Sequence, residues 1–469
     1  MNTVRTGEVA RTQLDNGLVV LTENIPTSIS ATLGIWIDVG SKHEAPQDAG
    51  ISHFVEHMLF KGTPTHSAYD IADVIEGVGG DINGSTDKEQ TCYSARVVDR
   101  HLDLAIDLVG DMLTNSVFSP DDLHIEKKVV IDEIKTYEDS PGDVIHDLFL
   151  RTAWNDHPLG RSTIGFEEVI RKADRAQLMA HRDRHYVPAG MMVTAAGHVD
   201  HHLVVTKAKQ WFGGESPPRA ECEWALPSVR NRCVFRARDT EQVYVCMGGD
   251  GISISHAEKY RLHMLDCILG GGMSSRLFQN IRERRGLVYN IGSFINAYMA
   301  GGAFGMYVIA GPESMPEVMR LLRDTCDDLR RDGVTPREFE RAREYLKGSF
   351  ALGLESSSFR MMRLMRSEQC HQRFVTPEEV IACYDAVTLE DVNAAARQYL
   401  DLDGYCMTAL GPFRNNRSRV LRSISSGPWD EDVPIVDKPK GRRRAKATAA
   451  VSPSVEGATP AVLAADTAR

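Results

Sequence analysis

The sequence predicts an α+β fold built as two homologous domains, each a mostly antiparallel sheet with helices packed on it. The chain has 469 residues, which is too many for one compact core. Strand-like and helix-like segments alternate along it, as in sheets that are covered by helices on one face. The pattern of the first half also returns, in degenerate form, in the second half. We therefore expect one architecture that occurs twice along the chain.

Hydrophobic patterning assigns the elements of the first half. Residues 18–21 and 32–39 predict strands, and residues 191–197 predict a strand that returns to the same sheet. Residues 69–78 and 102–113 predict helices. Strands from both ends of this half then share one sheet.

Composition predicts the domain boundaries. A polar, Pro-containing stretch at residues 213–228 predicts a linker between an N-terminal domain at residues 8–212 and a C-terminal domain at residues 229–418. Residues 421–469 contain a run of Arg followed by an end rich in Ala, Ser, Pro and Thr, which predicts a disordered tail.

The most informative motif is His-x-x-Glu-His at residues 53–57. On a helix, His53 and His57 share one face, so both imidazoles can bind one metal ion. Glu56 lies near that face, where a carboxylate beside a metal-bound water can act as a general base. Ser52 is the expected N-cap region of this helix. The same residues also fit a partly buried polar helix face without a metal.

A candidate third ligand lies on a later helix. A Ser-Pro pair at residues 119–120 predicts the start of this helix, and a second pair at residues 140–141 predicts its end. Glu126 and Glu133 are seven residues apart, so both point to one side of the helix. One could bind a metal while the other orients a ligand. Two solvated acids on a charged helix are the alternative that the spacing leaves open.

These motifs resemble the pitrilysin-type (M16) zinc peptidases. The similarity is greatest to the short two-domain branch that contains the β-type subunits of mitochondrial processing peptidase and their bacterial relatives, and it covers about residues 10–415. The resemblance implies that His53, His57 and Glu133 bind one zinc ion per chain. It implies that Glu56 is the general base, that Glu126 supports a ligand, and that the two domains enclose a chamber.

The second half contains a Gly-rich block at residues 269–278. The Gly-Lys-Ser/Thr signature is missing, which argues against a nucleotide site. The resemblance implies that Arg282 and Tyr289 reach the substrate near the scissile bond, where both side chains can donate to a developing oxyanion. The residues alone fit a surface salt bridge for Arg282 and a core aromatic for Tyr289.

Residues 79–95 predict a turn, a strand, a second turn and a second strand. The resemblance implies that this strand edge binds an extended peptide by backbone pairing, with Asn83 bonded to the substrate backbone. Relatives often have Ala after this Asn, whereas this chain has Gly84, which predicts a looser strand. By itself, Asn83 is also a typical turn residue.

The internal repeat aligns the metal motif with the second half, because residues 57–59 and 263–265 are both His-Met-Leu and both halves have a Pro that opens a long helix. The alignment pairs Lys259 with His53, Leu262 with Glu56 and Ser349 with Glu133. The second half thus lacks two ligands and the base. We expect one metal per chain, with the second half acting in substrate binding.

The net charge of −11 and the pI near 5.8 argue against nucleic acid as a partner. Nine Cys without a C-x-x-C pair predict free thiols in a reducing compartment. The N-terminus lacks an apolar signal core, and no run approaches the ~20 apolar residues of a membrane helix, so we expect no membrane association. We expect a bacterial cytoplasmic protein, with a processed organelle protein as the open alternative.

For function, the resemblance implies a zinc-dependent endopeptidase or oligopeptidase that hydrolyses peptide bonds with a metal-activated water. Its partner is a peptide or unfolded polypeptide. We expect a homodimer, with a hetero-oligomer as the alternative. Two other functions stay open: a subunit of a heteromeric processing peptidase that is inactive alone, and a non-catalytic scaffold relative. Scaffold relatives usually lose zinc residues, and none is missing here.

Overall fold

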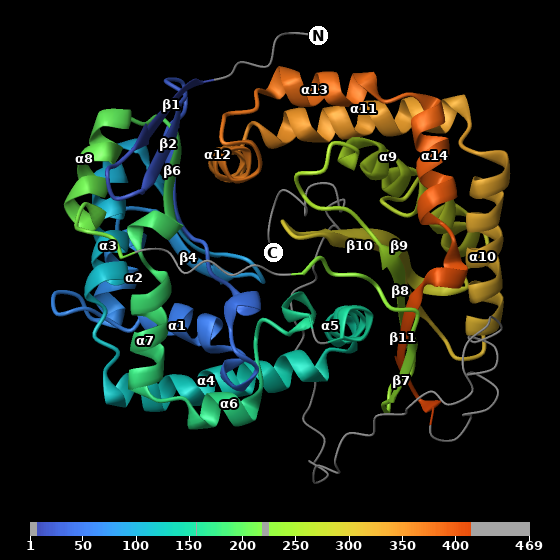
Figure 1. Cartoon of the computed structure of the whole chain (residues 1–469), viewed down its shortest axis with the longest axis horizontal. Helices are drawn as coiled ribbons and strands as arrows, with labels where there is room; N and C mark the ends of the chain where they lie inside the picture. The colour runs from blue at the N-terminus through green and yellow to red at the C-terminus, as the bar shows by residue number, and fades with distance from the viewer. Residues whose placement is uncertain (1–6, 156, 218–224, 414–469) are drawn as a thin grey trace.

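The structure is a computed structural model that describes residues 7–155, 157–217 and 225–413. The predicted tail at residues 421–469 and part of the predicted linker lie outside the described residues. The described chain forms two sheets with helices around them, which confirms the α+β class. Figure 1 shows the first half in blue and green on the left, facing the second half in yellow to red on the right.

The first sheet has six strands in the order β1-β2-β6-β3-β5-β4. The β2–β6 pair is parallel, and the other pairs are antiparallel. The strands are β1 (Glu8–Gln13), β2 (Val19–Asn24), β3 (Ser30–Ile37), β4 (Asp81–Thr86), β5 (Thr91–Val98) and β6 (Met191–Gly197). This order places β4 at one end of the sheet, where one of its edges has no partner strand among the described residues.

The second sheet has five strands in the order β7-β11-β8-β10-β9. Its strands are β7 (Cys233–Ala237), β8 (Val243–Asp250), β9 (Val288–Ala297), β10 (Gly302–Ala310) and β11 (Cys406–Gly411). The β7–β11 pair is parallel and the remaining pairs are antiparallel. The five strands have the same order and directions as β2-β6-β3-β5-β4 of the first sheet. Strand β9 therefore occupies the edge position that β4 has in the first sheet.

Each sheet carries helices of its own half on one face, and their apolar side chains form the two largest cores with the strands. The first half contributes α1 (Ile51–Leu59), α2 (Ala68–Glu76), α3 (Leu102–Asn115), α4 (Pro120–Asp139), α6 (Glu167–Lys172), α7 (Arg175–His185) and α8 (His201–Phe212). The second half contributes α9 (Lys259–Leu269), α10 (Met315–Asp332), α11 (Pro336–Gly353), α13 (Pro377–Ala386) and α14 (Leu389–Tyr399).

Two helices are exchanged between the halves. The first-half helix α5 (Pro141–Trp154) packs on β8 and β11, and the second-half helix α12 (Ser357–His371) packs on β2, β3 and β6. The sequence pattern predicts helices on one face of each sheet; the structure adds an exchanged helix on the other face. Figure 1 shows α5 beside the second sheet and α12 beside the first.

Apolar contacts hold both exchanged helices. On α12, Leu364 and Met365 pack against Trp36 in a buried cluster with the first sheet. On α5, Phe149 packs edge-on against Phe294 of the second sheet, with ring centroids 5.6 Å apart. Fully burying one such side chain stabilises a fold by about 1.5–3 kcal/mol. The exchange therefore ties the two halves together energetically.

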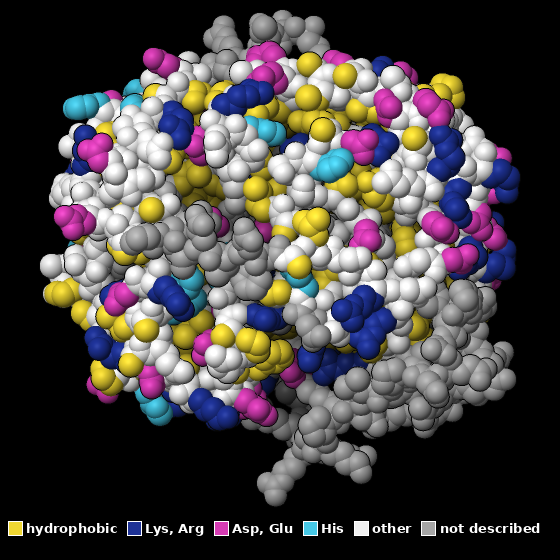
Figure 2. All heavy atoms as spheres, in the orientation of Figure 1, with side chains coloured by type: hydrophobic (Ala, Val, Ile, Leu, Met, Phe, Trp, Pro, Cys, Tyr) yellow, Lys and Arg dark blue, Asp and Glu magenta, His cyan; other side chains and the backbone are white. Residues whose placement is uncertain are grey.

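The outer surface carries mixed charge, with acidic and basic side chains interspersed over the face in Figure 2. In the described part of the chain, no helix is both long enough and apolar enough to cross a membrane.

Candidate active site

Helix α1 carries the His-x-x-Glu-His motif. It begins at Ile51, and its N-cap is Gly50 with φ +99°, a left-handed conformation that favours glycine. The prediction that Ser52 lies in the N-cap region is wrong, because Ser52 belongs to the first turn. The buried carboxylate of Glu44 takes the capping role, since its oxygens accept the N–H groups of Gly50 at 2.8 Å and Ser52 at 2.7 Å.

The apolar side of α1 fixes the direction of its polar side. Phe54, Val55 and Met58 are fully buried in the first core. His53 and His57 lie one turn apart on the opposite, half-buried side of the helix. Burial of the apolar residues thus presents both imidazoles toward α4.

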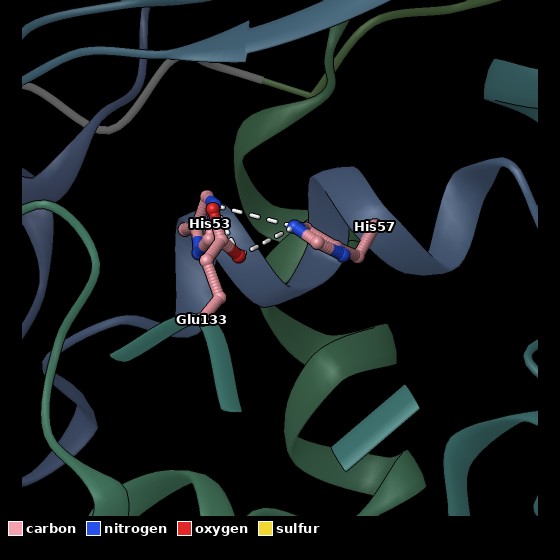
Figure 3. Close-up of side chains that lie close together, drawn as sticks. All are labelled: His53, His57 and Glu133. Atoms are coloured by element: carbon pink, nitrogen blue, oxygen red, sulfur yellow. Dashed lines mark hydrogen bonds and ion pairs between the residues drawn. The ribbon is translucent and has the colours of Figure 1, made fainter. Parts of the chain in front are cut away.

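The structure brings His53, His57 and Glu133 together. The Nε2 atoms of His53 and His57 are 3.3 Å apart. Oε2 of Glu133, from α4, lies 3.7 Å from Nε2 of His53 and 3.4 Å from Nε2 of His57. Figure 3 shows the carboxylate pointing toward both rings. In the described chain this is the one group of at least three His, Cys, Asp or Glu residues that could hold a metal.

The spacing of this group fits a tetrahedral zinc ion. Zinc bonds of about 2.0–2.1 Å to nitrogen and oxygen place neighbouring ligand atoms about 3.3–3.4 Å apart in a tetrahedron. The three separations of 3.3, 3.4 and 3.7 Å lie close to that range. Two imidazoles and one carboxylate form a typical donor set for a catalytic zinc with an open fourth position.

Glu126 lies next to this group. It is on the same side of α4 as Glu133, and that side faces α1. Its Oε1 is 2.8 Å from Nδ1 of His57, and its Oε2 forms an ion pair with Nζ of Lys61 at 2.7 Å. Burial works against its charge, but hydrogen bonds from His57 and Lys61 hold the pKa of Glu126 below its ordinary value. A charged Glu126 fixes the tautomer of His57 that leaves Nε2 free to bind a metal.

Without a metal, His57 is the positively charged member of this group. Burial opposes the protonation of His57, but hydrogen bonds to Glu126 and Glu133 outweigh it and raise the pKa of His57 to about 9. Burial and the neighbouring His57 lower the pKa of His53. Protonated His57 thus places a positive charge between the carboxylates of Glu126 and Glu133. The same two negative charges would stabilise a metal cation bound at this group.

Glu56 faces strand β4. Its Oε2 accepts a hydrogen bond from the hydroxyl of Thr86 at 2.5 Å. A Cβ on Gly84 would lie 2.9 Å from Oε1 of Glu56, so the glycine lets this carboxylate approach the strand. Burial raises the pKa of Glu56, and the hydrogen bond from Thr86 opposes the shift. A raised pKa is typical of carboxylates that exchange protons in catalysis.

The remaining predicted site residues lie outside this group. Asn83 is exposed on β4, pointing away from the face on which Gly84 contacts Glu56. Arg282, in a short helix at Phe278–Glu283, stacks its guanidinium 4.8 Å from the ring centroid of Phe278.

Tyr289 is 70% exposed at the start of β9. The register of β9 with β10 shifts there, so Tyr289 is the extra residue of a bulge, a feature that re-aims side chains. Among the described residues, neither Arg282 nor Tyr289 makes a hydrogen bond or ion pair with His53, His57 or Glu133.

Sequence reasoning missed three supporting residues: Glu44, Lys61 and Thr86. The period of a strand offered one signal, because Gly84 and Thr86 are two residues apart and so share a face. Lys61 follows α1 directly, within reach of acids on the same side. No local pattern indicates that Glu44 caps α1, since a buried Glu that accepts backbone N–H groups has no sequence signature.

Comparisons with known proteins identify the family of this chain. Residues 19–167 match the family model described as "Insulinase (Peptidase family M16)", and residues 172–346 match "Peptidase M16 inactive domain". An uncharacterised zinc protease of Mycobacterium bovis is 40% identical over 413 residues, or 87% of this chain and 94% of that protein. One of Bacillus subtilis is 37% identical over 407 residues, or 87% of this chain and 99% of that protein.

Solved structures share the fold. A peptidase M16 inactive domain from Pseudomonas fluorescens superposes with a TM-score of 0.80 at 20% identity, covering 86% of this chain and 98% of that one. A protease from Helicobacter pylori gives 0.78 at 21% identity, covering 87% and 100%. With family models over most of the chain and relatives near 40% identity, the chain belongs to peptidase family M16.

Proposed function

We propose that this chain is a zinc-dependent endopeptidase or oligopeptidase with one zinc ion per chain. The observation that carries the proposal is the triangle of ligand atoms from His53, His57 and Glu133, with separations close to those of tetrahedral zinc. The relatives in Bacillus subtilis and Mycobacterium bovis are named as zinc proteases, which supports the same metal and reaction class.

When bound, zinc would supply Lewis-acid chemistry, lowering the pKa of a water and polarising the peptide carbonyl. Glu56 accepts a proton from the attacking water at its carboxylate and later delivers it to the leaving amine. Thr86 holds one oxygen of Glu56, so the other oxygen is free to face the water. Glu126 keeps His57 in the tautomer that presents Nε2.

In this proposal the substrate binds as an extended strand along the free edge of β4. The order of the sheet leaves that edge without a partner among the described strands, and backbone pairing at such an edge is a common peptide-binding mode. Asn83 then bonds the peptide backbone. Arg282 and Tyr289 donate hydrogen bonds to the developing oxyanion from the second half.

The test measures zinc content and peptide cleavage for the wild type, Glu56→Gln and the control Glu76→Gln, whose carboxylate is exposed on α2. We expect about one zinc per chain in all three and cleavage only in the wild type and the control. Cleavage by a clean Glu56→Gln preparation would contradict the role of Glu56. Absence of zinc from the wild type would contradict the ligand assignment.

The same samples test the expected homodimer. Light scattering during size-exclusion chromatography gives the mass of the species that contains the activity. A zinc-loaded wild type that cleaves no peptide would favour a processing-peptidase subunit that needs a partner, or a scaffold relative. Restored cleavage on adding a second M16 chain would distinguish the first of these from the second.

A further inference from the structure

A pocket lies at the position in the second half that corresponds to the candidate zinc site. Helix α9 follows β8 and precedes the edge strand β9, as α1 follows β3 and precedes the edge strand β4. Helix α11 follows α10, as α4 follows α3. The pocket opens among α9, α11 and β9, and it is lined by Lys259, His263 and Ser349, the residues that the repeat aligns with His53, His57 and Glu133.

This pocket is not built for a metal. Lys259 replaces one ligand and Ser349 another, and within the described residues the only trio suited to a metal is the one in the first half. His263 occupies the position that aligns with His57, but its Nδ1 lies 3.1 Å from the hydroxyl of Tyr384. The aligned residues therefore occupy corresponding positions in the two halves, but those of the second half are not suited to bind a metal.

The lining of the pocket is basic. Lys259, Arg363 and Arg366 all line it, and no Asp or Glu is among its described lining residues. Lys259 donates to the carbonyl of Ile254 at 3.2 Å and lies 5.5 Å from the ring centroid of Tyr260; no ion pair to Lys259 is found among the described residues. Arg363 is buried and stacks its guanidinium 5.0 Å from the ring centroid of Phe350. Three cations in a partly apolar site favour an anionic ligand.

Arg366 offers a donor for that anion. Its Nε is buried and has no hydrogen-bond partner among the described residues, while its Nη1 bonds Gln369 at 3.2 Å. A buried donor without a partner is destabilising, so a ligand oxygen that accepts a hydrogen bond from it would gain affinity. The guanidinium fork also matches the two oxygens of a carboxylate.

Apolar residues form the rest of the wall, among them Ile252, Ile295, Phe350 and Phe359. The cavity measures about 80 Å³. Since one water occupies roughly 10–15 Å³ by this measure, the space fits a group of about five to eight non-hydrogen atoms. In Figure 2, hydrophobic side chains lie recessed among basic and His side chains at the top of the molecule, where Figure 1 places α11, α12 and α13.

We propose that this pocket binds a small carboxylate with an apolar side chain, with the carboxylate held by Lys259, Arg363 and Arg366. Two sources share this chemistry: the C-terminal residue of a peptide and a free carboxylic acid. The binding does not depend on the zinc site, so it can be measured whether or not the chain is a peptidase.

The experiment is calorimetric titration of the full-length protein with N-acetyl-leucine and, as the matched uncharged ligand, N-acetyl-leucinamide, in a buffer without carboxylates. The carboxylate, Cα and isobutyl group of the acid, about eight non-hydrogen atoms, match the size of the cavity, and the acetyl group extends outside it. We expect saturable binding of the acid and at least tenfold weaker binding of the amide. Arg366→Gln should weaken binding of the acid at least tenfold. The control Arg320→Gln, on the exposed side of α10, should leave it unchanged.

Thermal melts establish that each variant is folded, and Lys259→Met provides a second test on α9, a different helix from the α12 that carries Arg366. No binding of the acid by the wild type at concentrations up to the solubility of the ligand would overturn the proposal. Equal affinity for acid and amide, or unchanged binding by both folded pocket variants, would also overturn it.

Leu-terminated peptides with a free or an amidated C-terminus then distinguish the two sources, measured in the Glu56→Gln background so that no cleavage occurs. Tighter binding of the free-acid peptide than of N-acetyl-leucine supports a peptide C-terminus as the ligand. Binding of N-acetyl-leucine but not of the peptide supports a free carboxylic acid.

Discussion

The buried carboxylate of Glu126 lies 2.8 Å from Nδ1 of His57, while its other oxygen pairs with Lys61 at 2.7 Å. Glu126 is therefore positioned to orient the imidazole of His57 in the candidate zinc site. We expect Glu126→Gln to lower zinc affinity by about 10- to 100-fold, because this is the usual effect of removing the group that orients a metal-binding His. Competition with a zinc chelator measures the change.

Asp121→Asn is the matched control for Glu126→Gln, since Asp121 is an exposed acid in the first turn of the same helix. Its zinc affinity should equal that of the wild type. Equal affinity in Glu126→Gln would show that Glu126 does not orient His57.

Thr86→Val tests whether the base is positioned by β4. Thr86 donates to Glu56, and a hydrogen bond to a charged group contributes about 1.5–3 kcal/mol. We expect kcat to fall roughly tenfold or more in Thr86→Val while zinc content stays at the wild-type level. Steady-state kinetics and metal analysis on the same samples measure both quantities.

Thr86→Ser should restore most of the activity, because Ser retains the hydroxyl. If both substitutions reduce kcat equally, the methyl group of Thr86 and not its hydrogen bond is what matters. Loss of zinc in Thr86→Val would instead point to a general disturbance of α1.

Glu44 predicts a specific dependence of stability on pH. Burial raises the pKa of Glu44 to about 7, although the N–H groups of Gly50 and Ser52 oppose the shift. A carboxyl whose pKa is higher in the folded state binds its proton more tightly there. Its contribution to stability is therefore fully present below about pH 4.5 and is lost as the pH rises to about 7.

The measurement compares urea unfolding of the metal-free wild type with that of metal-free Glu44→Gln at pH 4.5 and pH 8. We expect the free energy of unfolding of the wild type, relative to the variant, to decrease by roughly 2–3 kcal/mol between these pH values. The other titrating groups are common to both proteins and cancel in the difference. A difference that does not change with pH would contradict the raised pKa.

Local patterns were sufficient for much of the fold. The strand predicted at residues 191–197 is β6 (Met191–Gly197), and the helix predicted at residues 102–113 lies within α3 (Leu102–Asn115). Alternation and helical period are short-range properties that the sequence displays directly. The capping of α1 by Glu44 and the hydrogen bond from Thr86 to Glu56 depend on how loops and strands meet, so no period shows them.

The predicted site residues divide along the same line. His53 and His57 share a face of one helix, so their meeting follows from helical spacing alone. Glu133 approaches both imidazoles only because α4 packs on α1. The family resemblance indicates this ligand, whereas local sequence patterns do not. The exchange of α5 and α12 was not predicted, because an apolar helix face fits either sheet and only the assembled fold shows which face is open.

The exchange leads to the last prediction, on how the halves unfold. Because α5 packs on the second sheet and α12 on the first, neither half can separate without exposing buried side chains such as Phe149 and Leu364. We therefore expect a protein cut at a protease site inserted between residues 217 and 225 to remain one particle in size-exclusion chromatography. It should also unfold in a single transition.

Leu364→Ala should weaken this association, because it removes a side chain that is 1% exposed within the interface of α12 with the first sheet. The expected loss is about 2–5 kcal/mol, which includes the cavity left behind. The control Leu352→Ala, at a position of α11 that is 69% exposed, should unfold like the wild type. If the cut protein separates into halves without denaturant, the exchanged helices do not hold the molecule together, because contacts of this size would have to be broken first.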